Sequence, residues 1–269
     1  MRRWVLALLV SLLFFCAGVA ESAEYQDGVY RGFYYQDGME QVAVQFELKD
    51  GVFRSLVLRK LKNQNGSFMD EQAEAWKKTA LTHFTALCDY LVGKEVDAIH
   101  ELYAPGEILA QAGLEMSEHI HYPKLVSALW DALSRRPYKL VDTSKLPEAE
   151  PYPDGMYTGV YSDDDGEQVV LDFTVRDNAI AQISYRKLEY KGIDYLSEEA
   201  SVAVQQVAGQ FGQLIDYLVD KDIAAVNDLY QPALIADDTD VSSAATLRAP
   251  KIISAVWEGL NKNAYSTVE

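Results

Sequence analysis

The chain has 269 residues, of which 24 are lysine or arginine and 41 are aspartate or glutamate, so its formal net charge is −17 at pH 7. An excess of negative charge of this size repels phosphate backbones and argues against nucleic acid as a partner. The two cysteines, Cys16 and Cys88, show none of the spacings of a zinc site.

The N-terminal segment has the layout of a secretory signal peptide. Two arginines follow the initial methionine, an apolar run covers residues 4–16, and small residues occupy 17–20. We therefore expect residues 1–22 to be a signal peptide, cleaved after Ala20 or Ser22. The mature protein is expected in the periplasm or cell envelope.

Two alternatives remain open for this segment. The apolar run is shorter than the roughly 20 residues of a membrane-spanning helix, but an uncleaved anchor would also have this pattern. Lipidation of Cys16 is the other alternative, and the bulky residues 13–15 before it argue against lipidation because small residues normally precede a lipidated cysteine.

The remainder of the chain contains one sequence twice. The segment Asp27–Gly32 recurs as Asp154–Gly159, and the spacing of 127 residues holds without a gap as far as Tyr138 and Tyr265. Long in-register similarity indicates two copies of one domain. We expect the first copy over 23–140, a proline-rich linker over 141–153 and the second copy over 154–269.

Each copy begins with a strand pattern. Apolar and polar residues alternate over 42–48 and 169–175, and the turn dipeptides Asp50-Gly51 and Asp177-Asn178 follow. A further strand leads to Arg59-Lys60 or Arg186-Lys187. The pattern predicts an antiparallel meander of about three strands in each copy.

Three helices are predicted after each meander. Asp70 and Ser197 are expected to be the N-cap residues of a long amphipathic helix. A shorter helix ends at Pro105 or Pro232, and the last helix begins near Pro123 or Pro250, where proline suits the first turn. The predicted fold class is therefore α+β, as two tandem copies that either pack together or remain apart.

Cys88 lies on the apolar stripe of the long helix, at the position that Ile215 holds in the second copy. After removal of the signal peptide it would be the single remaining cysteine, so an internal disulfide is excluded. The repeat indicates that Cys88 packs in the core.

The residues before the last helix of the second copy form a short motif, Asp240-Val241-Ser242-Ser243-Ala244-Ala245-Thr246. It resembles the flavin-attachment motif of the FMN-binding domain family, which includes the C subunit of the sodium-pumping quinone reductase and the G subunit of the Rnf complex. Asp240, Ser243, Ala245 and Thr246 match the motif. The chain departs from it at Ala244, where glycine is usual, and at Arg248, where the family commonly has threonine or serine.

The resemblance implies that FMN is esterified through its phosphate to Thr246 by a separate flavin transferase. The phosphate would then lie near the N-terminus of the last helix, where Arg248 and Lys251 could contribute positive charge. The alternative is a loop of small residues that caps this helix. The first copy has His119 at the position of Thr246 and therefore has no hydroxyl for attachment.

The loop Tyr190–Tyr195, with Gly192 at its centre, stands where the family places a loop against the flavin, so its two tyrosine rings are candidates for stacking on FMN. Arg186 and Lys187 could contact a flavin phosphate. The alternative for these two, and for Arg59 and Lys60 in the first copy, is a salt bridge to the long acidic helix.

A metal site is a weaker interpretation. Two histidines, His119 and His121, lie beside the carboxylate of Glu118, but no further ligand with suitable spacing accompanies them, so we expect exposed loop residues and no metal.

Together these features favour an exported FMN-binding domain protein that carries electrons between redox partners of the envelope, with possible association with a membrane redox complex. Whether it also turns over a substrate of its own stays open. The alternative is a ligand-binding or scaffold module that has lost the flavin.

Overall fold

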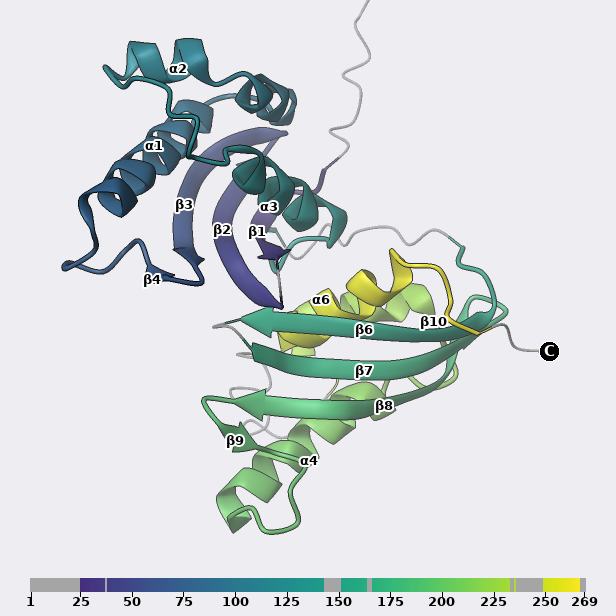
Figure 1. Cartoon of the computed structure of the whole chain (residues 1–269). Helices are drawn as coiled ribbons and strands as arrows, with labels where there is room; N and C mark the ends of the chain where they lie inside the picture. Colours follow the sequence, from purple (N-terminus) through teal and green to yellow (C-terminus); the bar gives the residue numbers. More distant parts are fainter. Residues whose placement is uncertain are drawn as a thin grey trace, which may run out of the picture.

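The computed structural model describes residues 25–36, 38–142, 151–163, 166–232, 235 and 249–266 (Figure 1). The expected signal peptide and most of the expected linker lie outside these residues. None of the helices in the described ranges is both long and apolar enough to cross a bilayer.

The first copy forms a five-stranded antiparallel sheet in the order β4-β3-β2-β1-β5. Its long strands are the three consecutive ones that the alternating pattern predicts, and its edges are two-residue strands. The strands are β1 (Gly28–Gln36), β2 (Met39–Lys49), β3 (Val52–Asn63), β4 (Gly66–Ser67) and β5 (Lys139–Leu140).

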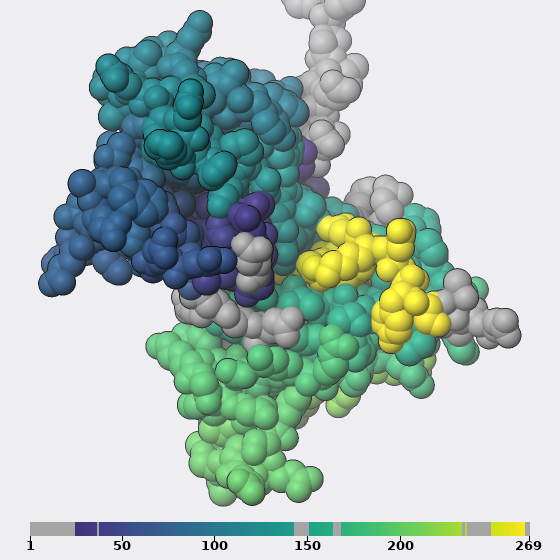
Figure 2. Space-filling view, in the orientation of Figure 1, coloured from purple at the N-terminus to yellow at the C-terminus, as the bar shows by residue number. Residues whose placement is uncertain are grey.

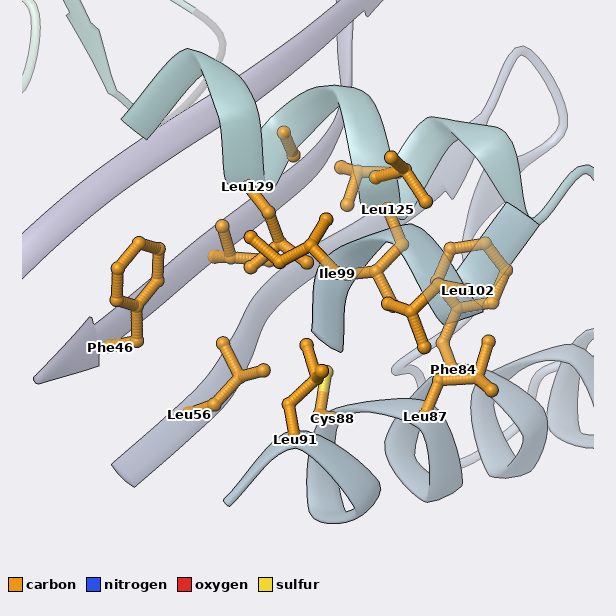
Figure 3. Close-up of a cluster of buried hydrophobic side chains, with 14 of the residues drawn as sticks. Phe46, Leu56, Phe84, Leu87, Cys88, Leu91, Ile99, Leu102, Leu125 and Leu129 are labelled. Atoms are coloured by element: carbon orange, nitrogen blue, oxygen red, sulfur yellow. The ribbon is translucent and has the colours of Figure 1, made fainter. Parts of the chain in front are cut away.

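Helices follow the sheet and bury their apolar stripes against it. They are α1 (Ala75–Leu91), the 3-10 helix η1 (Val96–Tyr103), α2 (Gly106–Gln111) and α3 (Pro123–Ser134). Figure 3 shows Cys88 of α1 within the apolar cluster between the helices and the sheet. Cys88 is 2 % exposed, and burial raises the pKa of its thiol to about 12, which confirms its role in packing.

The second copy repeats this order. Its sheet has the order β10-β8-β7-β6, with β9 paired to β8. The strands are β6 (Gly155–Asp163), β7 (Gly166–Arg176), β8 (Ala179–Tyr190), β9 (Ile193–Asp194) and β10 (Lys221–Asp222), and the helices are α4 (Val202–Asp216), the 3-10 helix η2 (Ile223–Tyr230) and α6 (Ala249–Leu260). The prediction of an α+β fold in two tandem units is confirmed.

The predicted N-caps of the long helices are wrong. Helix α1 begins five residues after Asp70, and its N-cap Glu74 makes no side-chain capping bond. Helix α4 is capped by Ser201, whose Oγ accepts from Val204 N. Asp70 and Ser197 instead close local turns, since their carbonyls accept from the amides three residues on. Ser197 Oγ also accepts from Glu199 N at 3.2 Å, the kind of local side-chain bond for which serine is favoured both in turns and at N-caps.

The aspartate at the start of each copy makes the same hydrogen bond in both copies. Asp27 Oδ1 accepts from Asp50 N at 2.6 Å, and its counterpart Asp154 Oδ1 accepts from Asp177 N at 2.8 Å. Asp50, Asp177 and Asn178 have positive φ, as the predicted turns require. The aspartate that opens each repeat therefore fixes the first turn of its sheet.

Two glycines allow the last helix of each copy to lie directly on the first strand. A Cβ on Gly32 would stand 2.0 Å from Ala128 O of α3, and one on Gly159 would stand 1.9 Å from Ala255 O of α6. Next to each crossing a helix carboxylate accepts from a strand amide, Asp131 from Phe33 N at 2.8 Å and Glu258 from Val160 N at 2.9 Å.

We expect Gly32→Ala to lower the free energy of unfolding by about 3 kcal/mol, because the new methyl group overlaps backbone that cannot move without lifting α3. Chemical denaturation measures the change. Gly209→Ala is the control: this exposed position in α4 has free space at its Cβ, so alanine should stabilise by about 0.5 to 1 kcal/mol. An unchanged Gly32→Ala protein would contradict the close crossing.

The copies pack against each other around Asp163, at the end of β6. The Asp163 carboxylate lies 3.4 Å from Arg31 and 3.3 Å from Arg59, both of the first copy, and accepts from Tyr161 Oη at 3.2 Å. The Arg31 guanidinium also stacks 3.9 Å from the Tyr138 ring centroid. Figure 2 shows the two copies as lobes in contact, so the two domains are not beads on a free linker.

Asp163→Ala should destabilise the contact between the copies by about 2 to 4 kcal/mol, since two largely buried guanidinium groups lose their counter-charge. Calorimetry is expected to show the unfolding of the two copies separating into two transitions. Arg54→Ala provides the comparison, because Arg54 and Asp50 are exposed and 4.0 Å apart, and its effect should stay within about 0.5 kcal/mol. A similar effect of both substitutions would count against the Asp163 contact.

Candidate functional site

The attachment motif predicted at Asp240, Ser243, Ala244, Ala245 and Thr246, together with Arg248, lies outside the described residues. The structure does describe what borders this segment. Six residues of the predicted site lie within the described ranges. They are Lys251, Tyr190, Gly192, Tyr195, Arg186 and Lys187.

Lys251 and Tyr190 lie together although 61 residues separate them in the sequence. Lys251, in the first turn of α6, is buried, and its Nζ donates to Gln168 Oε1. The same Nζ lies 4.5 Å from the ring centroid of Tyr190 and 5.5 Å from that of Tyr161. A buried cation among tyrosine rings therefore stands five residues after Thr246.

The loop that contains Tyr190 is a tight hairpin between β8 and β9. Tyr190 pairs with Ile193, and the two residues between them, Lys191 and Gly192, have φ of 52° and 75°. Two consecutive positive φ angles are typical of the type I′ turn, which glycine favours at its second position. This turn fixes the end of β8, and with it the Tyr190 ring, beside α6.

Tyr195 belongs to the core of the second copy. Its amide donates to Leu188 O at 2.9 Å, and its ring is 8 % exposed and meets Phe211 edge-on at 6.3 Å between centroids. Of the two tyrosines, Tyr190 is the one that lies next to the buried lysine.

Arg186 and Lys187 are paired within the sheet. Arg186 of β8 lies 3.4 Å from Asp172 of β7, and Lys187 lies 3.3 Å from Glu189, which is also on β8. In the first copy Arg59 meets Asp163, and Lys60 lies 2.8 Å from the buried Glu40. These ion pairs join strand residues, so the predicted salt bridge to the long helix is wrong.

The first copy contains a cavity at the corresponding place. It has a volume of about 90 Å³ between the end of β3, helix α1 and the residues before α3. Four of its lining residues, Asn63, Phe68, His119 and Lys124, correspond to Tyr190, Tyr195, Thr246 and Lys251. Sequence reasoning expected His119 and His121 to be exposed loop residues, which is confirmed, but it missed the cavity that they line. The register of the repeat would have located it.

The lysine at the start of the last helix has the same partner in both copies. Lys124 Nζ donates to Gln41 Oε1 at 2.6 Å and lies 5.7 Å from the Tyr34 ring centroid, as Lys251 does with Gln168 and Tyr161. This lysine–glutamine bond therefore belongs to the shared fold. The differences between the copies lie in the loop before the helix and in the hairpin.

Within the described ranges no group of three or more His, Cys, Asp or Glu side chains could hold a metal ion. His119 and His121 are exposed. Comparison of the chain with protein-family models, with curated proteins and with solved structures finds no match.

Helix α1 of the first copy carries a buried histidine, His83. His83 Nδ1 lies 2.9 Å from Tyr122 Oη, which also accepts from Ser117 N at 3.1 Å. Which of the two groups donates depends on the histidine tautomer. Burial lowers the pKa of His83.

This lowered pKa makes the protein less stable in acid. The unfolded chain protonates His83 near pH 6.5 while the folded state does not, so the stabilisation is present above that pH and is lost as the pH falls towards the folded pKa. His83→Gln should therefore show a weaker loss of stability between pH 7 and pH 5 (about the range in which histidine titrates). Urea denaturation at several pH values measures it, and parallel pH profiles for both proteins would contradict the prediction.

Proposed function

We propose that this chain is an exported member of the FMN-binding domain family whose second copy carries FMN esterified to Thr246. In this proposal a flavin transferase attaches the cofactor, and the protein passes electrons between redox partners of the cell envelope, in association with a membrane redox complex. FMN supplies reversible one- and two-electron transfer when bound.

The observation that carries the proposal is the buried ammonium group of Lys251 next to the Tyr190 ring. It stands at the start of α6, beside the segment that contains Thr246. A lysine near a helix N-terminus attracts a phosphate, and a tyrosine ring offers a planar surface for a flavin. The residues present on this side of the segment therefore fit a flavin phosphate and ring.

The described residues have distinct roles in this proposal. Lys251 attracts the phosphate, and Gln168 holds its ammonium group in place through the side-chain hydrogen bond. The hairpin around Gly192 sets the position of Tyr190. Asp240, Ser243, Ala244 and Ala245 form the sequence that the transferase recognises, and Arg248 adds positive charge. Arg186 and Lys187, paired with Asp172 and Glu189, act as parts of the sheet.

A non-redox ligand-binding or scaffold module is the second candidate. It is favoured by the lysine–glutamine bond, because Lys124 and Gln41 make the same bond in the copy that has no attachment threonine. The two candidates differ in one measurable property, the presence of covalent flavin.

Expression of the full chain together with a flavin transferase tests the proposal. We expect the intact mass to increase by one FMN less water, with flavin absorbance that stays with the denatured protein. Thr246→Val should abolish both, because it removes the hydroxyl and keeps the side-chain shape. His119→Val, at the corresponding position of the first copy, is the matched control and should leave both unchanged. Unmodified mass and colourless protein would leave the scaffold candidate.

A further inference from the structure

The second copy holds a short segment of the first copy on an aromatic surface. Arg136, just after α3, places its guanidinium 5.0 Å from the ring centroid of Trp257, and the carbonyl of Pro137 accepts a hydrogen bond from Tyr230 Oη. A tryptophan face and a tyrosine hydroxyl therefore bind an arginine and the carbonyl of the proline that follows it.

The first copy has an aromatic surface at the corresponding place. The spacing of 127 residues puts Tyr103 at the position of Tyr230 and Trp130 at the position of Trp257. The His100 ring contacts both, with its centroid 5.2 Å from that of Trp130 and 6.3 Å from that of Tyr103. His100, Tyr103 and Trp130 together are the first-copy aromatic surface.

The two surfaces differ in exposure. Trp257 is 1 % exposed and Tyr230 is partly buried, whereas Tyr103 is 58 % exposed, His100 is exposed and Trp130 is partly exposed. A single exposed aromatic side chain needs no explanation. Three neighbouring rings at the place where the other copy makes a protein contact indicate an interaction surface.

The charges next to this surface favour a basic partner. Tyr103 also lines a groove of about 630 Å³, and the carboxylates of Glu101 and Glu107 line the same groove. Lys94 lies 4.3 Å from the ring centroid of Tyr90, which borders the groove, and offsets part of this charge. The chain as a whole has a net charge of −17, so a guanidinium group is attracted to this face.

A second molecule of the same chain does not supply the occupant. Its Arg136 and Pro137 are held by its own second copy. The residues that correspond to them in the second copy are Asn263 and Ala264, which are neither cationic nor prolyl. The occupant is therefore a different protein.

We propose that the first-copy aromatic surface binds an arginine–proline segment of a partner protein. The guanidinium lies on the Trp130 and His100 rings, and the proline carbonyl accepts from Tyr103 Oη. Both contacts follow those that the second copy makes with Arg136 and Pro137. This binding is independent of the flavin proposed for the second copy.

Titration of the full-length protein with a capped synthetic peptide tests the proposal. The peptide has the sequence of residues 134–139, Ser-Arg-Arg-Pro-Tyr-Lys. In the NMR spectrum the indole N–H signals of Trp130 and Trp257 report on the two surfaces separately. We expect a saturable shift of the Trp130 signal.

The expected affinity is low, because Arg136 has a φ of 70° in the native contact and a free peptide rarely adopts that conformation. The dissociation constant should be on the order of 1 mM. A control peptide with Asn-Ala in place of Arg-Pro, as in the second copy, should bind about tenfold more weakly.

Variants at exposed tyrosines identify the surface. Tyr103→Ala should weaken peptide binding about fivefold to tenfold, and Tyr103→Phe, which keeps the ring and removes the hydroxyl, about threefold to fivefold. Tyr265→Ala is the matched control, because Tyr265 is 59 % exposed and belongs to the second copy, and it should leave binding unchanged.

Four results would overturn the proposal. The first is the absence of a saturable shift of the Trp130 signal, and the second is equal binding of the two peptides. The third is a shift of the Trp257 signal instead, which would place the peptide on the second copy. The fourth is a dimer, seen by sedimentation without peptide and lost in Tyr103→Ala, which would make a second molecule of this chain the occupant. None of these measurements depends on flavin at Thr246, so the two proposals fail separately.

Discussion

The close crossing of the last helix over the first strand is the contact on which the rest of each domain depends. Gly32 and Gly159 have no Cβ, so the backbones of strand and helix touch, and the carboxylates of Asp131 and Glu258 bond the strand amides beside the crossing. A helix held at its middle in this way has a fixed direction. Its first turn therefore always reaches the same corner of the sheet, where a lysine meets the glutamine of the second strand.

This corner is where the copies diverge. The framework of crossing helix, lysine and glutamine is common to both, while the hairpin after the third strand and the segment before the last helix carry different residues. Tyr190 stands beside the lysine in one copy and Asn63 lines the cavity in the other. Duplication thus preserved the part of the domain that sets geometry, while the two short segments at this corner diverged in sequence.

Sequence reasoning predicted the elements that local patterns determine. Alternating residues identified the long strands, and Pro123 and Pro250 identified the starts of the last helices. It placed the N-caps wrongly at Asp70 and Ser197, because aspartate and serine are favoured in turns as well as at N-caps. For the site, it brought Tyr190 and Lys251 into one neighbourhood, but it did not find Gln168 as the partner of Lys251 or the cavity beside His119. Both depend on contacts between distant segments, which no local pattern records.

The contact between the copies also has a consequence for self-association of the protein. Arg31 of the first copy corresponds to Thr158 of the second, and Asp163 of the second corresponds to Gln36 of the first. Neither end of the molecule therefore repeats the complete cation–carboxylate pair that joins the middle. A head-to-tail contact grows into a filament only when every unit offers both halves of the interface. Here Arg31 and Asp163 meet within one chain, so this contact is satisfied between its two copies and is not available to grow a filament.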